Sequence, residues 1–313
     1  MKKHVIGRRI FQMLLVFLGI SFLTFLLMFL APGDPVTAMY DAAGIVPTQE
    51  QLDSIRKSMG LDRPFLVQYF NWITDCLRGD FGMSFSKDQP VADLLIQRIG
   101  PTFKLGLLSL ILMLIFSIPL GILSAVRQDG IVDYLVRIVN FMGISMPGFW
   151  VALMLQYIFA LKLNLLPVIS SGTDLKKMIL PAVTLAFAMT AKYTRQVRTA
   201  VLEELNQDYV IGARARGLGW GVILWCHVLP NAMLPLVTML GLSLGSLLGG
   251  TTIVELIFSY PGLGQLAVNA VSARDYPLIQ GFVLWIALIY MGINLLVDIS
   301  YSFLDPRTRE AKS

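Results

Sequence analysis

The chain has 313 residues, of which 56% are hydrophobic and 14% are charged. Soluble domains carry about 25% charged residues, so this composition argues against a soluble protein and indicates one that resides in a membrane. The net charge of +5 would suit a nucleic-acid-binding protein, but the basic residues are not interleaved with aromatic ones. They cluster beside apolar segments, and this pattern orients membrane proteins in the bilayer.

Six apolar segments reach the roughly 20 residues that a helix needs to cross about 30 Å of hydrocarbon. The first follows a basic stretch, as a signal sequence does, but it is too long for one and lacks a small-residue cleavage site, so we expect it to be retained. The predicted class is an all-α integral membrane protein. We predict transmembrane helices at residues 10–31, 103–126, 134–160, 179–199, 229–256 and 279–303.

Residues 32–100 form the one segment with the composition of a soluble protein, since they contain nine acidic and six basic residues. Apolar residues recur with helical spacing at 48–57 and 64–77. We predict short helices there that lie over the outer mouth of the membrane domain.

Prolines mark the predicted spans. Pro101 lies just ahead of the second span and Pro181 just inside the fourth, where a missing N–H costs least. Pro147 falls within the third span, and we expect a kink there that neighbouring helices stabilise.

Lysine and arginine residues set the orientation. With the N-terminus inside, the cytoplasmic segments hold fourteen of them and the short external loops four. Because cytoplasmic loops carry the excess of positive charge, both termini are predicted to be cytoplasmic. Cys76 and Cys226 then lie on opposite sides of the membrane, so they cannot form an intrachain disulfide.

Several chemistries have no residues to support them. The sequence contains no phosphate-binding P-loop. His4 and His227 are the only histidines, and both fall at the predicted cytoplasmic face, so an intramembrane Ser-His-Asp site has no base. No His, Cys and carboxylate set has metal-ligand spacing. We therefore expect a non-catalytic chain with no metal site and no cofactor of its own.

The predicted cytoplasmic loop, residues 192–228, is the most informative segment. Its run from Val201 to Ala215 is amphipathic and is followed by Gly217 and Gly219. This pattern predicts a short surface helix that ends in a turn. Two interpretations compete: a helix whose small residues let a partner protein approach closely, and a basic amphipathic helix that rests on anionic lipid headgroups.

The spacing within this loop resembles the EAA loop of ABC-importer permeases. Gly217 is followed after nine residues by His-Val-Leu-Pro at 227–230, although Ile-Gly-Ala at 211–213 replaces the usual triplet. The run 208–217 is similar to the variant found in the dipeptide, oligopeptide and nickel branch of that family. Further segments match this branch in order: 31–35, 61–62, 80–84, 143–147, 249–250, 255–258, 260–264, 274–277 and 304–307.

The resemblance implies the permease fold of a type I ABC importer with six transmembrane helices and an external helical insertion between helices 1 and 2. The expected organisation is a tail and first helix at 1–31, the insertion at 32–100, a five-helix core at 101–304 with the coupling loop at 192–228, and a cytoplasmic tail at 305–313. The expected location is a bacterial plasma (inner) membrane.

The resemblance also implies partners. These are two ATP-binding subunits, which hold ATP and Mg, a second homologous permease chain in a heterodimer, and an external substrate-binding protein. The loop helix, called the coupling helix, would dock on an ATPase. The residues expected to form this docking site are Glu204, Asp208, Tyr209, Ala213, Arg214, Ala215, Arg216 and Gly217.

Other residues are candidates for the translocation path or for helix packing. Met146, Pro147 and Trp150 either line the path or simply kink a core helix. Glu255 either lines an outer vestibule or ties down the turn at Tyr260. Gly241, Gly245 and Gly249 form a face of small residues that suits close helix packing, within the chain or with a second permease. Asp298 either has a functional role within the membrane or, as we favour, pairs with a cytoplasmic-side arginine such as Arg198.

The cargo stays open between nickel or a nickel chelate and small peptides, with the length of the external segment slightly favouring nickel. The alternative class is an ATP-independent secondary transporter or channel. Such a protein would be expected to show inverted repeats or an intramembrane charge relay, and neither is apparent.

Overall fold

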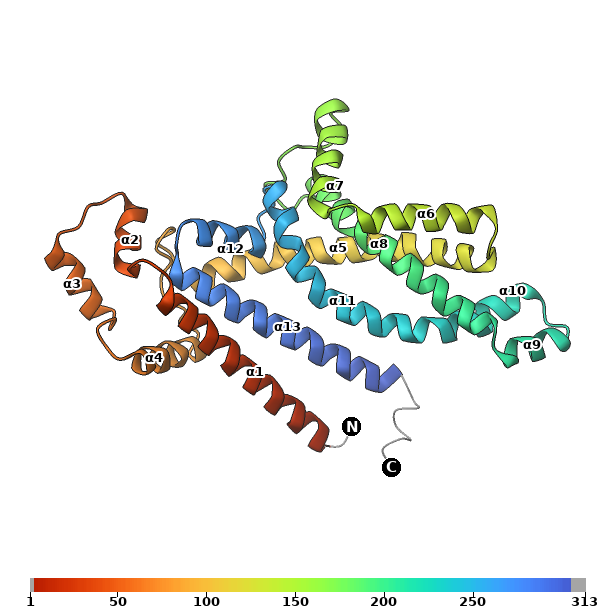
Figure 1. The fold of residues 1–313 in the computed structure, drawn as a ribbon, viewed down its shortest axis with the longest axis horizontal. Helices are drawn as coiled ribbons and strands as arrows, with labels where there is room; N and C mark the ends of the chain where they lie inside the picture. Colours follow the sequence, from red (N-terminus) through yellow and green to blue (C-terminus); the bar gives the residue numbers. More distant parts are fainter. Residues whose placement is uncertain (1–2, 305–313) are drawn as a thin grey trace. The chain divides into compact units, whose positions relative to one another are not determined.

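The computed structural model describes residues 3–304, and within this range the regular structure is helical apart from an isolated antiparallel bridge between Met83 and Pro90. The chain divides into two compact units (Figure 1). The first comprises residues up to Thr102 together with Pro261–Leu295, and the second comprises Phe103–Tyr260 and the residues from Leu296 onward. The predicted tail at 305–313, with most of the motif at 304–307, lies outside the described residues.

The first unit begins with a long apolar helix and continues with three short ones. These are α1 (Lys3–Leu30), α2 (Pro35–Ala43), α3 (Gln49–Ser58) and α4 (Phe65–Leu77). The unit also contains the start of α5 (Val91–Val126), α12 (Leu263–Ser272) and most of α13 (Tyr276–Leu304). The helices predicted at 48–57 and 64–77 are confirmed as α3, which begins with a capping box at Thr48, and α4, which begins after Pro64.

Aromatic rings join α4 to α1. Tyr69 lies with its ring centroid 5.7 Å from that of Phe25, and its hydroxyl is 2.9 Å from the Ser21 hydroxyl. Phe65 and Trp72, one turn away on either side, also contact Phe25. This cluster fixes α4 to the C-terminal half of α1.

The second unit contains the rest of α5, then α6 (Ile131–Ser145) and α7 (Gly148–Leu155), which continues as a π-helical stretch to Lys162. The remaining elements are α8 (Leu175–Leu205), α9 (Asp208–Ala215), α10 (Trp220–Val222), a second π-helical stretch (Ile223–Val228) and α11 (Leu229–Ile257). Extensive contacts of α8 with α6 and α11 build the unit around α8.

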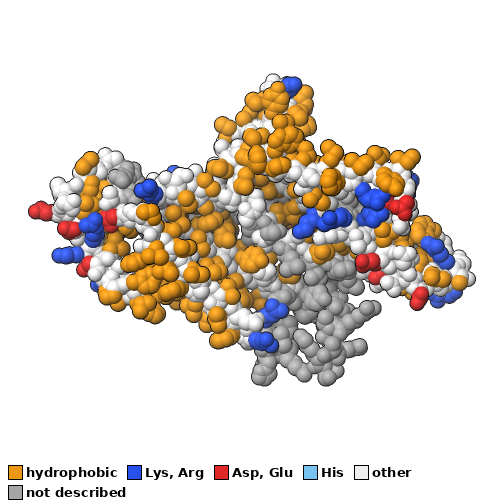
Figure 2. Space-filling model, in the orientation of Figure 1, with side chains coloured by type: hydrophobic (Ala, Val, Ile, Leu, Met, Phe, Trp, Pro, Cys, Tyr) orange, Lys and Arg blue, Asp and Glu red, His pale blue; other side chains and the backbone are white. Residues whose placement is uncertain are grey.

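Among the described residues, three helices are long and apolar enough to cross a membrane, at Gly7–Leu30, Val91–Val126 and Tyr276–Val297. The bent pair Ile131–Ser145 and Gly148–Lys162 is a fourth if it forms one span. Only 17% of the apolar window of α1 is buried within the protein, so most of its side chains are available to lipid, and Figure 2 shows extensive exposed apolar surface. Helices also occupy the fourth and fifth predicted positions, while the count of six spans stays a prediction.

Two of the predicted spans lie within helices that are longer than expected. The second helix begins at Val91 rather than 103, so Pro101 lies inside it, and the fourth runs from Leu175 to Leu205, so Pro181 lies further inside than expected. Hydropathy marks only the apolar part of a helix, and these two helices continue into polar sequence.

The third predicted span is not one kinked helix. Its two parts meet at an angle of 102°, because Met146 is extended (ψ 129°) and Pro147, which has no N–H, caps the second part. The residue before a proline disfavours helical geometry, so the break falls where the sequence predicts a kink but is much larger.

Candidate functional site

The coupling segment is a separate helix. α8 ends at Leu205, Gln207 is extended (φ −77°, ψ 149°), and α9 begins at Asp208, whose carboxylate suits the first turn of a helix. The single helix predicted over 201–215 is therefore wrong, because its first part belongs to the end of α8. Figure 1 shows α9 and α10 beyond the end of α8.

Gly217 ends α9 in the turn that the sequence predicts. Its φ of +76° lies in the left-handed region, its N–H donates to the Arg214 carbonyl at 2.9 Å, and the Leu218 N–H donates to the Ala213 carbonyl at 3.2 Å. These two bonds form a Schellman motif, which satisfies carbonyls at the helix end and favours glycine.

One face of α9 is buried within the second unit. Val210 and Ala213 are 1% and 2% exposed and pack in a cluster with Val201, Ile223 and Val228. The opposite face is exposed and carries Asp208, Ile211, Arg214, Ala215 and Arg216. Of the residues expected to dock a partner, Ala213 thus points inward, while most of the others are accessible.

Side chains fix α9 against the elements on both sides. The Tyr209 hydroxyl lies 2.7 Å from the Glu204 carboxylate at the end of α8, and the Arg214 guanidinium lies 4.7 Å from the centre of the Trp220 ring. Burial and the nearby Glu204 carboxylate raise the pKa of Tyr209. Glu204 and Tyr209, which are expected to take part in docking, therefore hold α9 against the end of α8.

A buried ion pair supports α8 in the same unit, and sequence reasoning missed it. Arg198 donates two hydrogen bonds of 2.7 Å to Asp133, and Asp133 also accepts from Ser124 and from the Asp129 N–H. The expected partner, Asp298, has its side chain outside the described residues, and Arg198 has the partner Asp133 instead. The sequence did contain a signal for this pair, because Asp133 is an acidic residue in a mainly apolar segment and therefore needs a partner.

The path candidates lie at two places in the second unit. Met146 and Pro147 form the break between α6 and α7, and Trp150 follows in the first turn of α7 with 40% of its surface exposed. Glu255 is completely buried, and its carbonyl accepts from the Tyr260 N–H at 2.8 Å. This bond involves only the backbone of Glu255, so both roles proposed for its side chain stay predictions.

The three glycines of α11 differ in their surroundings. A Cβ at Gly241 would collide with Val297 of α13, so that position serves packing within the chain. Gly245 is buried, whereas Gly249 is exposed and a Cβ there would meet nothing within 4 Å. The small-residue face therefore packs against α13 at Gly241 and is open at Gly249.

The architecture defines an all-helical integral membrane protein with a short helix, α9, between two of its long helices. A family model of binding-protein-dependent transport system inner membrane components matches residues 117–310, and a model of the N-terminal part of such membrane components matches residues 1–106. The chain therefore belongs to the family of binding-protein-dependent transport permeases, and the resemblance drawn from its motifs is confirmed.

Relatives match nearly the whole chain. The oligopeptide transport system permease protein AppB of Bacillus subtilis is 39% identical over 310 residues, which cover 96% of this chain and 97% of AppB. The dipeptide transport system permease protein DppB of Escherichia coli is 36% identical over 335 residues, which cover 97% and 98%.

A solved structure supports the fold. The inward-facing MetNI methionine ABC transporter matches with a TM-score of 0.55 at 19% identity and covers 68% of this chain and 96% of that one. At this identity the likeness concerns the fold alone.

Proposed function

We propose that this chain is a permease subunit of an ATP-driven importer for small peptides. It would form half of the translocation pathway, together with a second homologous permease chain, and receive cargo from an external substrate-binding protein. ATP and Mg would be held by two separate ATPase subunits. The observation that carries the proposal is α9, a short helix that packs one face in the second unit and leaves the other face accessible.

The geometry of α9 favours docking on a protein rather than binding to a lipid surface. Its exposed face carries Asp208 and the small residues Gly212 and Ala215, while Ile211 and Tyr209 are its exposed large apolar side chains. A helix that binds a membrane surface presents a continuous row of large apolar residues. A groove in a partner protein can instead close on small residues and pair with the charges around them.

The choice of peptides comes from the relatives, since AppB and DppB are described as oligopeptide and dipeptide permeases. The slight preference for nickel drawn from the length of the external segment finds no specific support. The described residues contain no group of three or more His, Cys, Asp or Glu side chains that could hold a metal ion, although a chelated metal would need none.

Reconstitution tests the proposal. The chain is placed in liposomes with its partner permease, the ATPase subunits and the external binding protein, and uptake of a labelled dipeptide is compared with uptake of a nickel chelate. We expect dipeptide uptake that requires ATP. Uptake without the ATPase subunits would support the ATP-independent class, and ATP-dependent uptake of the nickel chelate alone would assign the other cargo.

A further inference from the structure

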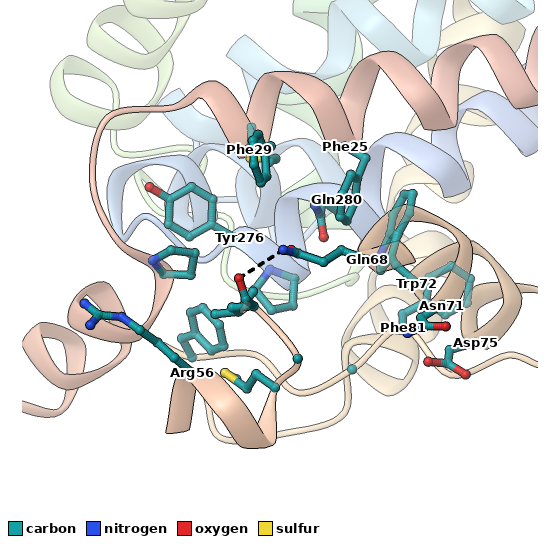
Figure 3. Close-up of a pocket in the computed structure, with 18 of the residues that line it drawn as sticks. Phe25, Phe29, Arg56, Gln68, Asn71, Trp72, Asp75, Phe81, Tyr276 and Gln280 are labelled. Atoms are coloured by element: carbon teal, nitrogen blue, oxygen red, sulfur yellow. Dashed lines mark hydrogen bonds between the residues drawn. The ribbon is translucent and has the colours of Figure 1, made fainter. Parts of the chain in front are cut away.

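The first unit encloses a cavity of about 550 Å³ that none of the assignments above uses (Figure 3). Its walls come from the end of α1, from the external helices α2 to α4, and from the start of α13. Small-molecule sites occupy about 300–1,000 Å³, so the space suits a ligand of one or two amino-acid residues.

Four of the segments that carry the family resemblance meet around this cavity, although they are far apart in the sequence. They contribute Gly33 to Pro35, Leu61, Asp80 to Gly82, and Tyr276 with Pro277. The turn that follows Gly82 is fixed to the fourth segment, since Asp275 accepts hydrogen bonds from the Ser84 hydroxyl at 2.6 Å and the Ser86 N–H at 3.0 Å. The cavity is thus built by ordered loops.

Aromatic side chains supply much of the wall. Phe25, Phe29, Trp72, Phe81 and Tyr276 line it, and Figure 3 shows them distributed around the space. Aromatic rings bury apolar groups well, and their faces attract cations.

The charges of the lining favour a cation. Among the lining residues Asp34, Asp75 and Asp80 oppose a single guanidinium, that of Arg56, which is already paired with Asp34 at 2.8 Å. Asp75 lies beside Asn71 in Figure 3, and its nearest described cation is Arg78, at 3.9 Å with 75% of its side chain exposed. Such an exposed pair is weak, so the Asp75 charge remains available.

Asp75 and Asp80 both lie near the end of α4, and the Asp80 carboxylate also accepts a hydrogen bond of 2.9 Å from the Gly82 N–H. α4 ends at Leu77, Gly79 adopts a φ of +90°, and the Asp80 N–H donates to the Asp75 carbonyl at 3.0 Å. This Schellman turn places both residues at the carbonyl end of α4, where the helix dipole adds negative potential.

We propose that this cavity binds the N-terminal residue of a small peptide, with the peptide ammonium at Asp75 and Asp80 and its apolar side chain against the aromatic wall. The permease would then hold peptide on its external unit, in addition to the pathway between the long helices. The inference rests on the proposed function for the choice of a peptide; the preference for an ammonium joined to an apolar group comes from the cavity.

A binding titration tests this. The full-length chain in lipid nanodiscs, without ATPase or binding protein, is titrated calorimetrically with the dipeptide Phe-Ala and with N-acetyl-Phe-Ala. We expect saturable binding of Phe-Ala and binding about tenfold weaker after acetylation, because acetylation removes the ammonium that would donate charge-assisted hydrogen bonds to the carboxylates. Equal binding of the two peptides, or no saturable binding of Phe-Ala, would overturn the proposal.

Variants locate the site. Asp75→Asn together with Asp80→Asn should weaken Phe-Ala binding about tenfold. Asp62→Asn is the control, because it removes an exposed carboxylate of the same segment that lies outside the cavity lining. This control should change Phe-Ala binding by less than about twofold. Equal effects of the two changes would overturn the assignment. The melting temperature of each variant verifies folding. The titration involves no transport, so a negative titration result would leave the outcome of the uptake experiment unaffected.

Discussion

Individual side chains decide how α8 is held in the second unit. Asp133 is completely buried and receives hydrogen bonds from Arg198, Ser124 and the Asp129 N–H. A carboxylate can remain charged without contact with water only if such partners replace the water. The pair therefore joins the start of α6 to the part of α8 that leads to α9.

Removing the charge of Asp133 should destabilise the protein. Asp133→Asn leaves Arg198 without its counterion, and breaking a buried pair in this way costs about 3 kcal/mol. The melting temperature in detergent, measured alongside Arg137→Gln, checks this. Arg137 also approaches Asp133, at 3.8 Å, but its side chain is 43% exposed, so its loss should cost less than about 1 kcal/mol. Equal effects of the two changes would contradict the assignment.

Asp34 links α2 and α3 through its carboxylate. Burial acts to raise the pKa of Asp34, but hydrogen bonds from Arg56 and Thr37 outweigh it and lower the pKa below its usual value. A lowered folded-state pKa stabilises the protein above the unfolded-state value of about 3.9, and this stabilisation is lost as the pH falls through the folded-state pKa.

We therefore predict a pH-dependent difference between the protein and its Asp34→Asn variant. Hydrogen exchange of α3 amides should be slower in the unmodified protein at pH 6, because the carboxylate then holds Arg56. The difference should shrink as the pH falls below about 3.9. A difference that is the same at pH 6 and pH 3 would show that the ionised carboxylate plays no part.

At the scale of elements, α9 depends on how its end is built. Gly217 has a left-handed backbone, and a Cβ there would meet nothing within 4 Å, so the cost of a side chain would be purely conformational. For a non-glycine residue this conformation costs roughly 1–2 kcal/mol. The orientation of the following π-helical stretch, and hence of the exposed face of α9, rests on this turn.

Gly217→Ala should weaken docking of the ATPase about fivefold, since about 1 kcal/mol of strain opposes the docked geometry. The measurement is the affinity of the purified ATPase for the permease in nanodiscs. Gly219→Ala is the matched control, because Gly219 is extended (φ −63°) and also has free space around it. Docking that is equally affected by both changes, or by neither, would argue against the role of the turn.

At the scale of the whole molecule, orientation in the membrane stays a prediction that rests on the distribution of basic residues. The two cysteines offer a direct test. Cys226 is exposed, whereas Cys76 is buried, and burial together with the charges of Asp75 and Asp80 raises the pKa of Cys76 to about 12. Thiolate is the reactive form, so a maleimide should react at Cys226.

A membrane-impermeant maleimide should therefore label the chain in permeabilised cells but not in intact spheroplasts, because Cys226 is predicted to face the cytoplasm. Cys226→Ser should abolish the labelling. Equal labelling of intact spheroplasts would place this segment outside and reverse the predicted orientation.

The sequence by itself determined the membrane class, the approximate positions of the long helices, the turn at Gly217 and the membership of the permease family. Each of these depends on local information: apolar runs, helical spacing, glycine at a helix end and the order of short motifs. The short helices α3 and α4 followed from the same kind of pattern.

Only the tertiary structure decided the 102° break after α6, the pairing of Arg198 with Asp133, the inward position of Ala213, and the meeting of four motif segments around one cavity. These features depend on contacts between residues far apart in the chain. A proline in the sequence indicates that a helix is interrupted, but the packing of its neighbours sets the angle. A charged residue indicates that a partner is needed, but the fold selects which one.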